Sequence, residues 1–339
     1  MRRSTEPPPA ASGGVLATNP IERTAVPARG ALRDRVDDLG RRRVQELFST
    51  WALRLCAFSA VAGLLLIMVF VFREALPIVF DPEIRAEAGL ASFFSTHVWQ
   101  PVSGVPKYGI VPLLVGTLKV VAVAMAFAVP ISVLAALYAS EFASERFREI
   151  LKPAIEMLAG IPSVVLGFFA LIVMASWLQA LTGSATRLNA LNAGIALGLA
   201  IVPTIFSVCE DALRAVPRSY REASLALGAS RWQTAWNVTL PAASAGVAAG
   251  ILLGLARGVG ETMIVLMASG NAALVSASVL DSVRTISATI AAELAEVVFG
   301  SAHYSVLFFL GAVLFSITFM INVAAGMFVD RLRRRLGGA

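Results

Sequence analysis

The sequence predicts an all-α integral membrane protein with about six transmembrane helices. Two observations carry this prediction. Of the 339 residues, 57% are hydrophobic and only 15% are charged, and the mean hydropathy is +0.76, so the chain has too little polar surface for a soluble protein of this length. The apolar residues also fall into separate runs of about 20 residues, the length at which a helix crosses a bilayer.

Hydropathy assigns the spans and divides the chain into four regions. The expected spans are residues 55–72, 111–139, 154–178, 191–208, 242–268 and 304–328. Residues 1–50, rich in arginine and proline, predict a disordered cytoplasmic tail, and residues 51–110 hold the first span and an extracytoplasmic connection. Residues 111–330 form the expected core, and residues 331–339 form a basic cytoplasmic tail.

Basic residues are unevenly distributed between the two sets of connections. With the amino terminus inside, one side carries the bases of the tail, of residues 140–153, of residues 214–231 and of the carboxyl terminus. The other side receives only scattered bases, which are Arg73, Arg85, Lys107, Arg187 and Arg284. Since short cytoplasmic connections are enriched in Lys and Arg, both termini are expected in the cytoplasm. The net charge of +6 is therefore a topology signal, and the arginines lack the interleaved aromatic residues of a nucleic-acid surface.

The most polar stretch inside the core is residues 218–241, which we call the elbow. Its sequence predicts two short helices with a break at Gly228, because glycine accepts a positive φ without penalty. Ser230 can cap the second helix through its side-chain oxygen. The dipeptide Leu240-Pro241 ends the motif before the next apolar run.

Small residues on the elbow would allow another protein to approach its backbone closely. Ala223, Ser224 and Gly228 have short side chains or none, and Glu222 offers a charge that could orient a partner. The stretch is thus either a docking element or an ordinary amphipathic helix between two spans. The charge distribution predicts that it lies in the cytoplasm.

The fifth span contains an arginine and a glutamate four residues apart. Arg257 lies about 15 residues beyond the elbow, roughly 20 Å deep and near the middle of the bilayer. A charge there must face protein or water, and Glu261 at i+4 can pair with it. The two residues either offer a guanidinium to a passing oxyanion or fix helix packing as a buried ion pair. Arg284, before the sixth span, either meets the anion at the outer mouth or pairs with Asp281 or Glu293, and pairing is the expectation.

Five stretches resemble one family of transport proteins, in order and with plausible spacing. They read KYGIVPLLVGTL (107–118), LAGIPSVVLGFFAL (158–171), ALRAVPRSYREASLAL (212–227), GLARGVGETMIVLMASGN (254–271) and RTISATIAAELAE (284–296). Together they resemble the phosphate-importer permeases (the PstC family) of binding-protein-dependent ABC importers. The elbow resembles the EAA loop of these permeases, carried here by Glu222, Ala223, Ser224, Gly228, Leu240 and Pro241, with Ser224 in place of the usual second alanine.

The resemblance implies a type I ABC-importer permease of MetI-like fold, multi-pass in a bacterial cytoplasmic membrane. In that family the EAA loop is a coupling helix that sits in a cleft of a separate cytoplasmic ATPase. The implied partners are a PstA-like second permease that completes a heterodimer, a PstB-like ATPase dimer and a PstS-like phosphate-binding protein. The implied function is ATP-driven import of inorganic phosphate, with Arg257, Glu261 and Arg284 as candidates along the pathway.

The residues themselves give no reason to expect an enzyme. None of Lys107, Lys119 and Lys152, which are all the lysines, follows a glycine in a GxxxxGK[ST] pattern, so ATP would be hydrolysed by another chain. No group of His, Cys and carboxylates has metal-ligand spacing, so neither a metal nor a cofactor is expected. Two alternatives remain: a permease for another oxyanion, molybdate or sulfate, and a secondary transporter that needs no ATPase.

Overall fold

The computed structural model describes residues 29–335, so most of the predicted amino-terminal tail and the last four residues lie outside the described part of the chain. The chain divides into two units, residues 1–66 and residues 67–339. Helix α1 (Arg29–Ala75) is continuous. No proline interrupts the passage from the charged residues into the apolar run, so α1 continues across residue 50, where we expect the tail to give way to the first span.

The other elements follow in chain order. Before the core come α2 (Pro77–Phe80), α3 (Pro82–Glu87), α4 (Leu90–Ser95) and the strands β1 (Trp99–Gln100) and β2 (Lys107–Tyr108), which pair antiparallel. The core comprises α5 (Val111–Glu141), α6 (Glu145–Ala159), α7 (Ser163–Phe169), the π-helical turn η1 (Ala170–Met174), α8 (Ala175–Thr182), α9 (Ala190–Arg214), α10 (Arg218–Ala226), α11 (Arg231–Thr234), the π-helical turn η2 (Ala235–Thr239), α12 (Leu240–Ala242), α13 (Ser244–Gly260), α14 (Met263–Ala268), α15 (Ile286–Glu293) and α16 (Ala302–Arg335).

Within the described residues, five helical segments are long and apolar enough to cross a membrane. They cover Glu46–Phe80, Val111–Glu141, Ser163–Thr182, Ala190–Arg214 and Ala302–Leu332. A sixth candidate is the bent pair Arg231–Ala242 and Ser244–Gly260, whose two parts meet at 71°. The predicted all-α fold with about six spans is confirmed.

Helices α5, α9 and α13 pack against one another at the centre of the second unit. Two glycines of this packing have no room for a side chain. A Cβ atom at Gly194 of α9 would lie 2.5 Å from Val123 of α5, and one at Gly254 of α13 would lie 2.5 Å from Ile205 of α9. The glycines therefore let the helix backbones approach closely, as small residues do in membrane helix bundles.

The third span starts later than expected because a helix break precedes it. We predicted a span over residues 154–178, whereas α6 ends at Ala159 and the spanning segment starts at Ser163. Pro162 is the N-cap residue of α7, with a ψ of 135°, and a proline disfavours helical conformation at the residue before it. α6 is thus a separate amphipathic helix outside the span.

The fifth span is also broken, at Glu261. We predicted one helix over residues 242–268, but α13 ends at Gly260 and α14 begins at Met263. Glu261 has extended backbone (φ −68°, ψ 135°), and its carboxylate accepts a hydrogen bond from the Thr262 N–H at 3.2 Å. Such local side-chain bonds compete with the helical backbone bonds, and the adjacent Gly260 is a poor helix former.

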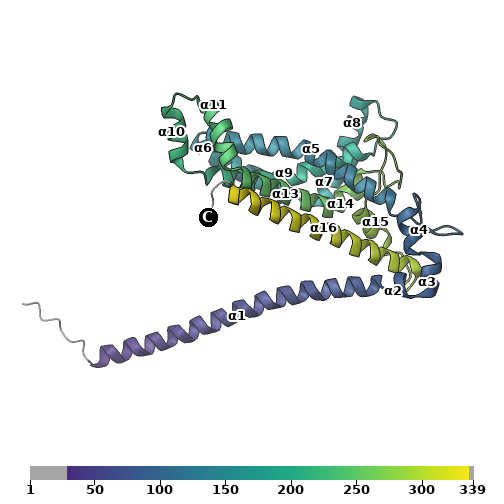
Figure 1. Cartoon of the computed structure of the whole chain (residues 1–339), viewed down its shortest axis with the longest axis horizontal. Coiled ribbons are helices and arrows are strands. Elements are labelled where there is room, and N and C mark those ends of the chain that lie inside the picture. Colours follow the sequence, from purple (N-terminus) through teal and green to yellow (C-terminus); the bar gives the residue numbers. More distant parts are fainter. Residues whose placement is uncertain (1–28, 336–339) are drawn as a thin grey trace, which may run out of the picture. The chain divides into compact units, whose positions relative to one another are not determined.

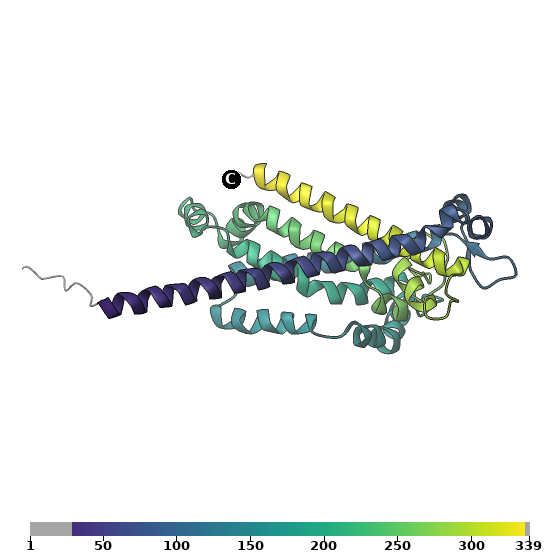
Figure 2. The same ribbon diagram turned by 90° about the horizontal axis from the view of Figure 1, so that it is seen from below.

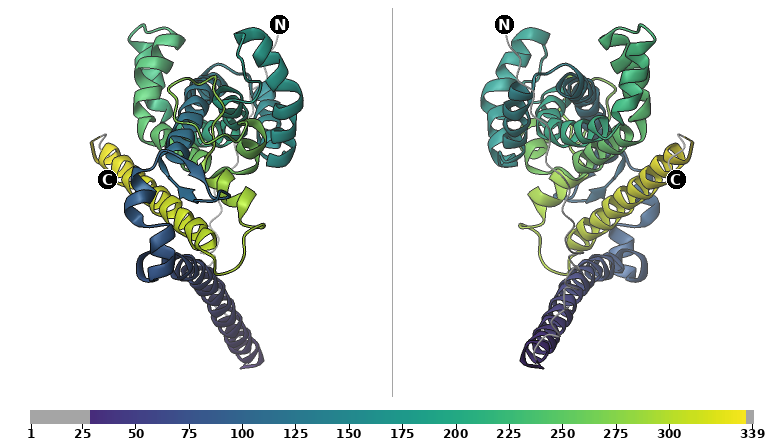
Figure 3. Two further views of the ribbon diagram at one scale, coloured as in Figure 1. Left: turned by 90° about the vertical axis from the view of Figure 1, so that its right-hand side faces the viewer. Right: turned by 90° about the vertical axis from the view of Figure 1, so that its left-hand side faces the viewer.

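The bundle of the second unit carries short elements at both of its ends. Figure 1 shows α10 and α11 at one end of α5, α9 and α13, and α8 and α15 toward the other end. Figure 2 shows that the carboxyl-terminal end of α16 (yellow) lies at the same end as the elbow helices (green). Figure 3 looks along the length of the bundle helices α5, α9 and α13, with α16 (yellow) crossing at their flank. The elbow and the end of α16 therefore share one end of the bundle.

Candidate functional site

The elbow is two helices joined by a tight turn at Gly228, as the sequence predicts. Gly228 has a φ of +86° and directly follows Leu227, the C-cap residue of α10. The Gly228 N–H donates to the Leu225 carbonyl at 3.0 Å, and the Ala229 N–H donates to the Ser224 carbonyl at 3.2 Å. This pair of bonds is a Schellman motif, which satisfies the last free carbonyls of the helix and stops it there.

The second elbow helix starts at the predicted cap. The Ser230 hydroxyl accepts a hydrogen bond from the Gln233 N–H at 3.2 Å, and the Gln233 side chain accepts one from the Ser230 N–H at 2.8 Å. This is a reciprocal capping box. Gln233 was not predicted as part of the cap, although the Ser-x-x-Gln spacing is visible in the sequence. The helix continues past Leu240 and Pro241, and the bend into α13 falls at Ala243.

Glu141, at the end of α5, anchors the elbow to the bundle. Its carboxylate pairs with the Arg221 guanidinium at 2.8 Å, and its backbone carbonyl accepts a hydrogen bond from Arg231 at 2.7 Å. Arg221 also donates to the carbonyls of Leu213 and Val216, at 2.8 and 2.7 Å. Both side chains of the ion pair are largely buried, so solvent screens it weakly. The sequence analysis did not identify Glu141.

The residues proposed for docking have two different positions in the elbow. Ser224 faces the second helix, where its hydroxyl lies 2.9 Å from the Thr234 hydroxyl. Glu222 and Ala223 are exposed, and Leu227 is 90% exposed. Ser224 therefore helps to hold the two elbow helices together, whereas Glu222, Ala223 and Leu227 form a surface that is open to another molecule.

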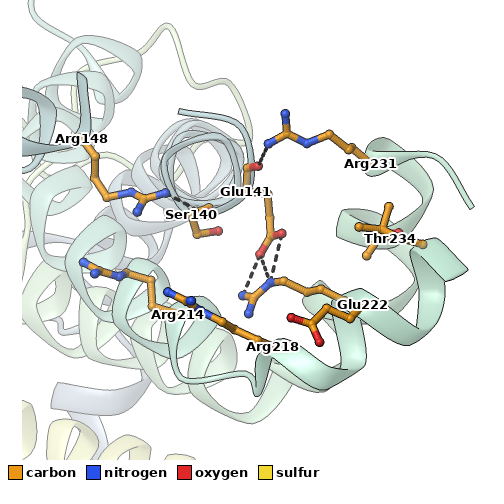
Figure 4. Close-up of a pocket in the computed structure, with 10 residues that line it drawn as sticks. Ser140, Glu141, Arg148, Arg214, Arg218, Glu222, Arg231 and Thr234 are labelled. Atoms are coloured by element: carbon orange, nitrogen blue, oxygen red, sulfur yellow. Dashed lines mark hydrogen bonds and ion pairs between the residues drawn. The ribbon is translucent and has the colours of Figure 1, made fainter. Parts of the chain in front are cut away.

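A pocket of about 420 Å³ lies between the elbow and the ends of α5, α6 and α9. Figure 4 shows the charged side chains that surround it. They are the arginines Arg148, Arg214, Arg218, Arg221 and Arg231 and the carboxylates Glu141 and Glu222. The pocket therefore has an excess of positive charge. In the sequence these arginines indicated which connections are cytoplasmic, and their gathering around one pocket was not predicted.

Helix α6 is fixed to α9 by a buried carboxylate. Lys152 lies 2.9 Å from Glu210, which is fully buried, and 2.7 Å from Asp211. Hydrogen bonds to Asp211 and then to Glu210 raise the pKa of Lys152 above its ordinary value. Arg214 approaches the same Glu210 carboxylate at 3.4 Å. A charged residue close to the apolar run of the fourth span was the signal that could have identified this contact.

Arg257 and Glu261 do not form the ion pair that their i+4 spacing in the sequence allows. Arg257 is exposed, and its guanidinium donates to the Thr204 hydroxyl at 2.7 Å. Glu261 is the first residue after α13 and has extended backbone, so the i+4 spacing no longer brings the two side chains together. The Glu261 carbonyl instead accepts a hydrogen bond from Ser287 at 2.7 Å.

Arg284 pairs with Glu293, one of the two partners expected for it. The guanidinium lies 2.8 Å from the Glu293 carboxylate, which also contacts His303 at 2.9 Å and accepts from the Trp99 indole N–H at 3.1 Å. Burial raises the pKa of Glu293, but the hydrogen bonds from His303 and Trp99 and the charge of Arg284 outweigh burial and hold it below its ordinary value. The network joins β1, α15 and α16 at the end of the bundle opposite the elbow.

The spans, the broken fifth helix and the projecting elbow define the chain as a multi-pass membrane transport subunit. Residues 128–336 match the family model described as "Binding-protein-dependent transport system inner membrane component". Since this match covers more than half of the chain, the chain belongs to that family of ABC-importer permeases. The family predicted from the sequence motifs is confirmed.

Curated relatives match over most of their length. The chain is 32% identical over 279 residues to the probable ABC transporter permease protein YqgH of Bacillus subtilis, covering 82% of this chain and 89% of the relative. It is 31% identical over 317 residues to the phosphate transport system permease protein PstC of Xylella fastidiosa, covering 88% and 96%. It is 36% identical over 249 residues to PstC 1 of Mycobacterium tuberculosis, covering 67% and 74%.

Two solved ABC transporters share the fold. A chain of the MetNI methionine transporter is 21% identical, with a TM-score of 0.50, and covers 66% of this chain and 94% of its own. A chain of a bacterial transporter involved in alginate import is 15% identical, with a TM-score of 0.58, and covers 86% and 99%. At these identities the likeness concerns the fold alone, and it agrees with the predicted MetI-like type I architecture.

Proposed function

We propose that this chain is the permease subunit of an ATP-driven importer that carries inorganic phosphate across the bacterial cytoplasmic membrane. The observation that carries the proposal is the similarity to a phosphate transport permease over nearly the whole length of both chains. A PstA-like permease would complete the channel, and a PstS-like protein would deliver phosphate from outside. Because the chain has no GxxxxGK[ST] pattern, ATP hydrolysis is assigned to a PstB-like ATPase dimer.

Coupling to the ATPase is assigned to the elbow. Glu222 and Ala223 are exposed on α10 and form the proposed contact surface, while Ser224 and Gly228 give the elbow its shape. Leu240 and Pro241 lie just before the bend into α13, so a displacement of the elbow would be passed to the broken fifth span. ATP binding would draw the elbows of the two permeases together and turn the pathway outward, and hydrolysis would reset it.

The proposed topology has the elbow and both termini in the cytoplasm. Support comes from the basic residues that flank the spans and from the common position of the elbow and the carboxyl-terminal end of α16. The domain limits are correspondingly a cytoplasmic tail, a first span with its extracytoplasmic connection, a core over residues 111–330 and a short basic tail.

The translocation pathway is assigned to the surface that carries Arg257. This arginine lies within a spanning segment and is exposed in the single chain, although a charge in a membrane must face protein or water. A water-filled pathway between this chain and the second permease meets that requirement. Glu261, at the helix break, and Arg284, at the outer end, are the other candidates along it.

Phosphate uptake by an Arg257→Gln variant tests this function. The complete complex is expressed in cells that lack their own phosphate importers, and uptake of radiolabelled phosphate is measured. We expect uptake by the wild type and a loss of at least about tenfold in the variant, because each charge-assisted contact to an oxyanion is worth about 1.5–3 kcal/mol. Arg187→Gln, at an exposed arginine outside the proposed pathway, is the control and should keep normal uptake.

Two results would contradict the proposal. If phosphate is a poor substrate and its uptake is abolished by competing sulfate or molybdate, the chain transports another oxyanion. A complex that contains no ATP-binding subunit after extraction in mild detergent would remove the basis for an ATP-driven importer. Normal uptake in Arg257→Gln would leave that arginine a structural role only.

A further inference from the structure

The pocket behind the elbow is formed by four separate parts of the chain. Glu141 comes from the end of α5, Arg148 from the first turns of α6 and Arg214 from the end of α9, whereas Arg218 and Arg231 come from the elbow. Its volume of about 420 Å³ lies within the range of about 300–1,000 Å³ that is typical of small-molecule sites. One wall of the pocket therefore belongs to the helix bundle, and the other belongs to the elbow, which is proposed to move during transport.

The carboxylates of the pocket do not neutralise its arginines. Five arginines and two glutamates line it. Glu141 is fully engaged with Arg221. In the part of the chain that the structure describes, Arg148 donates to the backbone carbonyls of Ala139 at 2.7 Å and Ser140 at 3.0 Å and to no carboxylate, so its guanidinium is oriented without its charge being cancelled. The pocket thus holds a fixed excess of positive charge.

Two of the arginines retain free donors. Arg214 is 52% exposed, and its one acidic contact within the described residues, Glu210 at 3.4 Å, is shared with Lys152. Among the side chains that the structure describes, Arg218 has neither a hydrogen bond nor an ion pair, and Figure 4 shows it beside Arg214. Glu222 in the same pocket has no ion pair within the described residues either, so it does not satisfy Arg218.

We propose that this pocket binds a phosphate-type oxyanion, held chiefly by Arg214 and Arg218. The guanidinium fork matches the oxygens of a phosphate group in a bidentate manner, and two forks on one group are a strong anion site. The bound group would bridge the bundle, through Arg214, to the elbow, through Arg218. Occupancy would therefore restrain the elbow and reduce its coupling to ATP hydrolysis. This proposal rests on the cytoplasmic position of the elbow proposed above, and it does not require that phosphate is the transported solute.

Two sources could supply the phosphate group, and binding measurements separate them. The complete complex is reconstituted in nanodiscs of zwitterionic phosphatidylcholine, without a binding protein, in the Arg257→Gln background that removes the proposed pathway contact. Inorganic phosphate is titrated by calorimetry. We expect binding that weakens at least about tenfold in Arg218→Gln and further in the Arg214→Gln/Arg218→Gln double variant. The control Arg146→Gln changes an exposed arginine of α6 outside the pocket and should leave the affinity unchanged.

The second arm uses nanodiscs that contain phosphatidylglycerol and counts retained lipids by native mass spectrometry. If inorganic phosphate does not bind but the wild type retains an anionic lipid that Arg218→Gln loses, the site takes a lipid phosphate group. Arg218→Gln keeps the contact between Arg214 and Glu210, so the variant is expected to fold, and its melting temperature checks this. Equal phosphate binding and equal lipid retention in wild type and variants would overturn the proposal. Uptake by the wild type is read separately, so failure of the pocket and failure of the transport function are distinguishable.

Discussion

At the scale of single residues, Glu141 anchors the elbow although it lies outside the sequence motif. Its carboxylate and its carbonyl hold two arginines, one on each elbow helix, at 2.8 Å and 2.7 Å. Replacing Glu141 by Gln removes the charge that balances the largely buried Arg221, and we expect a loss of about 1–3 kcal/mol in the stability of the elbow.

Limited proteolysis and the melting temperature of the purified complex measure the effect of Glu141→Gln. Cleavage within residues 218–241 should become faster and the melting temperature should fall. The matched control is Glu149→Gln, an exposed glutamate on α6 for which the structure describes no ion pair, and it should behave as wild type. If both variants are equally resistant to protease, Glu141 does not anchor the elbow.

Glu293 makes the opposite end of the bundle sensitive to acid. Its pKa in the folded chain is below the ordinary value of 4.5, so the contacts to Arg284, His303 and Trp99 contribute stability that is fully present above pH 4.5 and is lost as the pH falls through the folded value. We expect the melting temperature of the wild type to drop as the pH falls below 4.5, and that of Glu293→Gln to start lower and change less. Parallel curves for the two proteins would contradict this prediction.

At the scale of elements, the turn of the elbow depends on a residue that accepts a positive φ without strain, which is glycine. Gly228 has a φ of +86° and no atom within 4 Å of the position of a Cβ, so an alanine there is strained by its backbone and not by crowding. We expect Gly228→Ala to cost about 1–2 kcal/mol, measured as a lower melting temperature of the complex. Gly326→Ala, in the middle of α16 and with equally open space, should cost nothing. Equal melting temperatures for the two variants would show that the turn relaxes.

The elements that the sequence predicted correctly are those with local signals. Gly228 and Ser230 specify their turn and cap within a few residues, so the break in the elbow could be read directly. The break at Glu261 was missed because one of its supports is a hydrogen bond from Ser287, which is distant in sequence. The start of the third span was missed because the apolar face of α6 runs into the span in a hydropathy average, which does not register the helix break at Pro162.

The contrast between local signals and contacts distant in sequence also explains which parts of the candidate site were predicted. The docking residues Glu222, Ala223 and Ser224 are consecutive in the chain and were predicted from one motif. The pocket behind them needs Glu141, Arg148 and Arg214, which approach the elbow only after α5, α6 and α9 have packed. No spacing rule within one segment contains that information, because the contacts are set by tertiary structure.

At the scale of the whole molecule, the chain has the features of one part of a larger assembly. Arg257 is exposed within a spanning segment, and Leu227 and Trp232 are exposed on the elbow, at 90% and 58%. A charge at membrane depth and apolar side chains on a polar projection are both costly for an isolated subunit. We therefore expect partner surfaces at two places, one beside the fifth span and one around the elbow.

The surface around the elbow can be tested at Glu222. This residue is exposed and makes no ion pair within the described part of the chain, so a change there leaves the fold of the elbow intact. If the elbow docks to an ATPase, Glu222→Lys places a repulsive charge in the contact, and the ATPase should copurify less, with uptake reduced at least about tenfold. Glu149→Lys makes the same charge change on α6, outside the elbow, and should alter neither. Full copurification and full uptake in Glu222→Lys would show that the exposed face of α10 is not the contact, and the coupling surface would then have to involve Trp232, the exposed aromatic side chain of α11.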